Sequence, residues 1–175
     1  MKLNVVPART GLLWTRLGIQ TFFRQPLALA GLFFMYMAAM FVLSALPQFG
    51  PMLAAVLVPG SALGMMAAAQ EASRGRFPMP SVLISAFRAG RQRLRATLLL
   101  GVIYAAGWFL VLWLSQQFFP LPAAGAVPTA EGQGQIAAFY LGVTLLHALL
   151  AVPFWHAPAL VHWHGVSPLK SLFFS

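Results

Sequence analysis

The chain has 175 residues, of which 60% are hydrophobic and 7% are charged, and its 11 basic and 2 acidic side chains give a net charge of +9. A water-soluble surface needs far more charged side chains than this, so the composition excludes a soluble globular domain and indicates a protein whose main solvent is lipid. The absence of cysteine excludes disulfides, thiolate metal sites and cysteine nucleophiles.

The first predicted element is an amphipathic helix over residues 9–24. In helical projection, its three arginines and Gln20 fall within an arc of roughly 80°: Arg9, Arg16, Gln20 and Arg24. Large apolar side chains cover the rest, which is typical of a helix that lies in the membrane interface. A cleavable signal peptide is not expected, because the basic region is too long and the apolar run after it has full span length.

Four apolar segments are long enough to cross a hydrocarbon core of ~30 Å and are predicted to be membrane-spanning helices. They cover residues 27–46, 52–69, 96–119 and 136–158. The connection at 120–135, rich in Pro, Ala and Gly, is predicted to be an irregular, exposed loop. Residues 1–175 are therefore expected to form one all-α integral membrane domain, a polytopic helical bundle with interfacial helices.

Prolines and glycines inside the spans predict close packing and kinks. In the second span, Pro59 predicts a kink, and Gly60 and Gly64 have the small-xxx-small spacing of closely packed membrane helices. In the fourth span, Pro153 and Pro158 are expected to kink or end the helix.

A second basic helix is predicted between spans two and three, from Ser81 as N-cap to Arg95. Arg88, Arg91 and Arg95 would share one face at i, i+3 and i+7. Clustered juxtamembrane arginines gain about 1 kcal/mol each near an anionic leaflet, so we expect them to bind lipid headgroups. The alternative is that they only set the topology. The candidate lipid- or anion-binding residues are Arg16, Arg24, Arg88, Arg91 and Arg95.

The distribution of charge predicts the orientation of the chain. Four spans place the N-terminus, residues 71–95 and the tail at 166–175 on one side, and all 11 Lys and Arg residues fall there. The positive-inside rule assigns that side to the cytoplasm and the loop at 120–135 to the periplasm.

The segment 167–175 is expected to begin a further helix, with Pro168 in its first turn, so the chain is expected to be a fragment of a longer protein. A weak internal echo supports this expectation. In this echo, the segment 59–63 followed by Gly75 and Pro80 resembles the segment 157–160 followed by Gly165 and Pro168.

Four histidines near the C-terminal end do not form a metal motif. His162 and His164 would point to different faces of a helix, and no cysteine or carboxylate lies near them or near His147 and His156. We expect interfacial histidines, no metal and no cofactor. Without an intramembrane carboxylate, a cysteine or a recognisable serine–histidine pair, we also expect no enzyme activity.

The favoured function is a non-enzymatic membrane module that binds anionic lipid or a membrane-protein partner, with no nucleic-acid partner. The alternative is a transporter or permease-like component for a small solute, because Pro59-Gly60 and the segment 153–158 interrupt apolar helices in the two halves of the chain. No Asp, Glu, Lys or Arg lies inside a predicted span, which argues against a proton relay.

Several sequence segments resemble a family of uncharacterised proteobacterial inner-membrane proteins. The resemblance rests on residues 24–29, 59–64, 87–91, 154–161, 163–165 and 167–175, and it spans most of the chain outside the 120–135 loop. This family is more distantly similar to the membrane domain found with glycerophosphodiester phosphodiesterases. The resemblance implies a helical membrane fold of about six spans, of which this chain would lack the last part. It implies no activity, because the phosphodiesterase name belongs to a separate catalytic domain.

Overall fold

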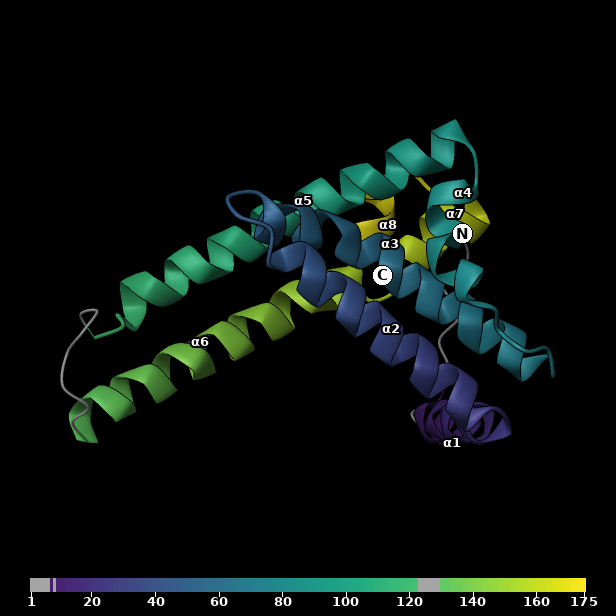
Figure 1. Ribbon diagram of the computed structural model, residues 1–175, viewed down its shortest axis with the longest axis horizontal. Helices are drawn as coiled ribbons and strands as arrows, with labels where there is room; N and C mark the ends of the chain where they lie inside the picture. Colours follow the sequence, from purple (N-terminus) through teal and green to yellow (C-terminus); the bar gives the residue numbers. More distant parts are fainter. Residues whose placement is uncertain (1–6, 8, 123–129) are drawn as a thin grey trace.

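The computed structural model describes residues 7, 9–122 and 130–175, and every regular element in this part of the chain is a helix (Figure 1). The elements are α1 (Arg9–Arg24), α2 (Pro26–Ser44), α3 (Gly50–Ser73), η1 (Pro80–Ile84), α4 (Ser85–Arg88), α5 (Arg91–Phe118), α6 (Ala130–Phe154), α7 (Ala157–His164) and α8 (Pro168–Phe174). Four stretches are long and apolar enough to cross a membrane: α2, α3, α5, and α6 with α7. The predicted all-α bundle is confirmed.

Helix α3 is the centre of the bundle, because it contacts α1, α2, η1, α4, α5 and α7. All of its buried residues except Pro59 and Leu63 are glycine or alanine. The buried residues are Gly50, Ala54, Ala55, Pro59, Gly60, Leu63, Gly64, Ala68 and Ala72. Between helices in lipid there is little hydrophobic driving force, so association depends on close van der Waals contact, which small residues allow. The other helices therefore approach the backbone of α3 closely.

Glycines make the closest contacts of α3. A Cβ on Gly64 would lie 2.5 Å from the carbonyl oxygen of Leu83 in η1, and a Cβ on Gly60 would collide with the ring of Phe87. The short η1–α4 segment thus packs on the glycine face that the sequence assigned to helix packing. On α5, Gly101 fits directly against the carbonyl of Val56, where a Cβ has no room.

Several helix ends lie at two opposite ends of the molecule. Figure 1 shows α1, α4, α7 and the start of α5 at one end, and the end of α5 with the start of α6 at the other. Helix α1 is seen almost end-on, so it runs across α2 rather than along it. We call the first end, made of α1, residues 74–95 and the α7–α8 hairpin, the basic end, because every described Lys and Arg belongs to these segments.

Two predicted boundaries are wrong. The loop predicted at 120–135 ends earlier, because α6 already begins at Ala130; Glu131 in its first turn favours this start through the helix dipole. The part of that loop from 123 to 129 lies outside the described residues. The fourth span does not end at Pro158. It is broken between Phe154 and Ala157 and resumes as α7, with Pro153 at the end of α6 and Pro158 in the first turn of α7.

We predict that Gly101→Ala destabilises the protein by about 1–3 kcal/mol, because the new methyl group meets the rigid backbone of Val56. The matched control is Gly31→Ala on α2, where nothing lies within 4 Å of the added Cβ and the substitution raises helix propensity. Thermal unfolding in one detergent compares the two variants with wild type. Equal midpoints for both variants would contradict the close contact between α3 and α5.

Candidate functional site

The arginines between residues 88 and 95 lie on two separate helices, α4 and α5. The single helix predicted from Ser81 to Arg95 is wrong: η1 begins at Pro80 after Met79, and the chain turns at Gly90, whose φ of 92° is in the left-handed region. Arg88 therefore ends α4, whereas Arg91 and Arg95 lie one turn apart at the start of α5. The three side chains share an end of the molecule but not one helix face.

Acidic side chains neutralise little of this charge. Glu71 accepts two hydrogen bonds from the Arg76 guanidinium, at 2.5 Å from Nε and 2.7 Å from Nη2. This hydrogen-bonded pairing holds the pKa of Arg76 above its ordinary value. The other acidic residue, Glu131, is at the opposite end, in α6.

Four arginines in the segment 88–95 are exposed, and none makes an ion pair within the described residues: Arg88, Arg91, Arg93 and Arg95. Closely spaced like charges repel one another, and a bound anion relieves that repulsion. This segment is therefore suited to a negatively charged partner such as a phosphate group, which guanidinium binds with paired hydrogen bonds.

Helix α1 is attached to the bundle by one charged hydrogen bond. The guanidinium of Arg24 donates to the carbonyl oxygen of Ser73, the last residue of α3. This bond satisfies one of the free carbonyls at the C-terminus of α3 and places a positive charge at the negative end of the helix dipole. Arg16 is exposed, and no such partner occurs among the residues that the structure describes. Of the two arginines that the sequence singled out on this helix, only Arg24 is thus engaged with the protein.

Helix α1 buries none of its residues against the rest of the described chain. Its apolar side chains Leu12 and Phe23 are 79% and 70% exposed. Such a surface is stable where acyl chains cover it, and arginines on the other side can reach headgroups. The exposed apolar side chains of α1 fit the predicted interfacial helix, which stays a prediction.

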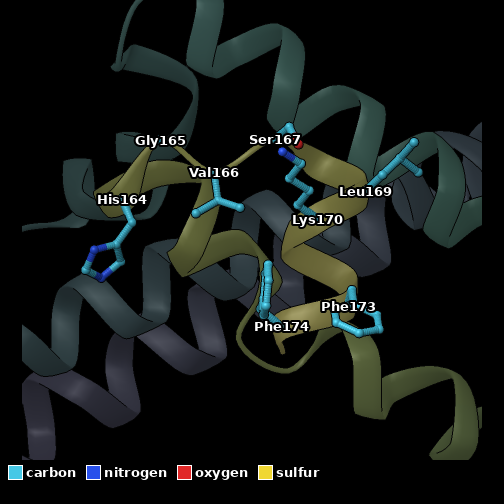
Figure 2. A pocket seen from close by; sticks show the side chains of 8 residues that line it. All are labelled: His164, Gly165, Val166, Ser167, Leu169, Lys170, Phe173 and Phe174. Atoms are coloured by element: carbon cyan, nitrogen blue, oxygen red, sulfur yellow. The ribbon is translucent and has the colours of Figure 1, made fainter. Parts of the chain in front are cut away.

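Cavities open along the basic end. The largest, about 990 Å³, is a groove between α1, α2, the end of α3 and the α6–α7 break. A second, about 840 Å³, lies at the α7–α8 loop. Figure 2 shows His164 on one side of this loop, with Lys170, Phe173 and Phe174 on the α8 side. A third, about 410 Å³, lies where the same loop approaches Arg93 at the start of α5.

One histidine lies inside the bundle, a position that the sequence analysis missed. His147 packs edge-on against Trp108 and Tyr104, with ring centroids 4.9 Å and 6.2 Å away, beside a cavity of about 270 Å³. One pattern in the sequence could have indicated an aromatic site here: Tyr104 and Trp108 are four residues apart and so share one helix face. Within residues 9–122 and 130–175, no three His, Cys, Asp or Glu side chains lie close enough to hold a metal ion.

These features define a polytopic α-helical membrane protein with one strongly basic end. A "Probable inner membrane protein" of Burkholderia thailandensis is 40% identical over 187 aligned positions, which cover 100% of this chain and 68% of the relative. The chain belongs to the family of this inner membrane protein. No protein-family model and no solved structure matches the chain.

We predict that Arg24→Gln loosens α1 by about 1 kcal/mol, because the end of α3 loses a charged donor. Amide hydrogen exchange should then become roughly fivefold faster in residues 9–24. Arg16→Gln, on the same helix and without a hydrogen-bond partner in the described part of the chain, is the matched control and should leave the exchange unchanged. Equal exchange rates in the two variants would show that Arg24 does not attach α1.

Proposed function

We propose that this inner membrane protein is a non-enzymatic module that binds anionic phospholipid through the basic end, at the cytoplasmic surface of the membrane. The observation that carries the proposal is the set of four exposed arginines between residues 88 and 95, which no carboxylate of the described chain neutralises. Guanidinium groups at membrane level attract anionic headgroups by about 1 kcal/mol each.

The packing of η1 and α4 supports the same function. These elements rest on Gly60 and Gly64 of α3, so the position of Arg88 is set by a rigid helix rather than by a free loop. A ligand that binds several arginines at once loses less entropy when those arginines are already held in place. A loop that served only to set topology would need charge but no such packing.

A transporter component is the second candidate, favoured by the break in the fourth span. Trp155 and His156 are not helical, although apolar helix continues on both sides, and Pro59 lies inside α3. Interrupted helices often surround a solute site in transporters. Solute flux in proteoliposomes that Pro59→Ala or Pro158→Ala abolishes would favour this function over lipid binding. The distant relationship to phosphodiesterase-associated membrane domains rests only on the sequence segments quoted above.

We predict that Arg88→Gln, Arg91→Gln and Arg95→Gln together reduce retention of phosphatidylglycerol by at least about tenfold, because three headgroup contacts are lost. The control is the triple variant Arg9→Gln, Arg74→Gln and Arg76→Gln, which removes the same charge from the same end. Native mass spectrometry in mild detergent counts the bound lipids. Equal loss in both variants would show that total charge, not this arginine set, retains lipid.

We predict opposite accessibility for the two ends of the molecule. Since the chain has no cysteine, a single introduced cysteine is the only thiol of the protein that a maleimide can label. A membrane-impermeant maleimide should label Gln133→Cys at the start of α6 from the periplasm, and Ser81→Cys in η1 only after the inner membrane is opened. The reverse pattern would overturn the proposed orientation.

A further inference from the structure

We propose that the groove between α1, α2, α3 and the α6–α7 break holds an acyl chain of an anionic phospholipid, with the phosphate beside Arg24. This proposal rests on the proposed function, because it assigns a second contact to the same class of ligand. It adds a lipid-binding groove that the arginines at 88–95 do not provide.

The walls of the groove are apolar and come from elements far apart in the sequence. Phe33 and Phe34 of α2 line the groove together with Met65 and Met66 of α3. Trp155, just before α7, and Trp163, within α7, complete the apolar lining. Methionine side chains adapt their shape, and flat rings give large contact areas, so these walls suit a flexible hydrocarbon chain. The volume of about 990 Å³ is within the usual size of ligand sites.

Polarity changes along the groove in the direction that a phospholipid requires. The end formed by α1 and the last turn of α3 carries Thr21, Gln70 and Ser73, and Ser73 accepts the hydrogen bond from Arg24. Met65 lines the groove toward the bundle interior. It lies eight residues before Ser73 on α3, and therefore about 12 Å from Ser73 along the helix axis. His156, at the helix break, is the polar side chain of the inner end.

The charge at the polar end selects the headgroup. Arg24 uses one N–H for Ser73, and its guanidinium has further donors that can bind phosphate oxygens. No carboxylate is among the described residues that line the groove, and Glu71, in the same turn of α3 as Ser73, is paired with Arg76. A membrane helix from a partner would need an acidic end to match this site, whereas a phospholipid already combines the apolar chain with the anionic head.

The occupant can enter from the bilayer, because the rims of the groove are open. Phe34 and Trp155 are 68% and 66% exposed, and α2 buries only Leu29 and Leu32 among its residues. Acyl chains therefore already contact this face in a membrane, and binding needs no passage through water.

The test is to fill the groove. Ala30 and Ala69 line it, so Ala30→Phe and Ala69→Phe place a ring in the space of the acyl chain. Ala38→Phe, on the exposed side of α2 and outside the groove, is the matched control. We expect both groove variants to lose retained phosphatidylglycerol by about tenfold in native mass spectrometry from nanodiscs of phosphatidylglycerol and phosphatidylcholine, while the control keeps it. Equal retention in all three variants overturns the proposal.

A second measurement uses the wild-type protein and does not depend on the folding of variants. Phosphatidylglycerol with a diazirine in the acyl chain should cross-link to α2, α3 and α7 within the groove, and an excess of unlabelled phosphatidylglycerol should compete. Cross-links confined to outward-facing residues of α6, or insensitive to the competitor, overturn the proposal. If the groove variants keep the lipid but the Arg88, Arg91 and Arg95 variant loses it, the groove fails and the proposed function stands. If instead the groove variants lose the lipid but the Arg88, Arg91 and Arg95 variant keeps it, the arginine site is rejected and the groove stands.

Discussion

The close approach of α5 and the η1–α4 segment to the backbone of α3 is the contact on which the rest of the structure depends. In lipid, helices have no water to expel, so binding energy comes from dispersion contacts at short range. Gly101 against Val56 and Gly64 against Leu83 provide that range. Because these contacts hold η1 and α4 on α3, they also set the position of Arg88 and of the start of α5.

The second constraint is electrostatic. With only 2 acidic residues in the chain, the protein cannot neutralise its basic end by itself. Glu71 forms an ion pair with Arg76, and Arg24 donates a hydrogen bond to the carbonyl oxygen of Ser73. This hydrogen bond joins the ends of α1 and α3. The arginines between residues 88 and 95 make no ion pair within the described residues, and we propose that anionic headgroups neutralise them.

The two halves of the chain use one type of turn at the basic end. After α3, Gly75 has φ 75°, and Met79 is extended before Pro80 opens η1. After α7, Gly165 has φ 63°, and Ser167 is extended before Pro168 opens α8. A left-handed glycine ends a helix, and a proline after an extended residue begins the next, so each short helix can fold back on the bundle. The echo in the sequence is therefore also an echo in local conformation.

The sequence by itself determined the helical class, the four apolar stretches and the concentration of basic residues, because length, hydropathy and charge act locally along the chain. It also placed α1 and the helix after Ser167, since amphipathic spacing and an N1 proline are local signals. Tertiary structure alone decided that Gly90 separates Arg88 from Arg91, that Arg24 caps α3, that His147 packs between aromatic rings, and that a groove forms beside α7. Each of these depends on contacts between residues distant in sequence or on one backbone dihedral, and neither hydropathy nor helical periodicity records them.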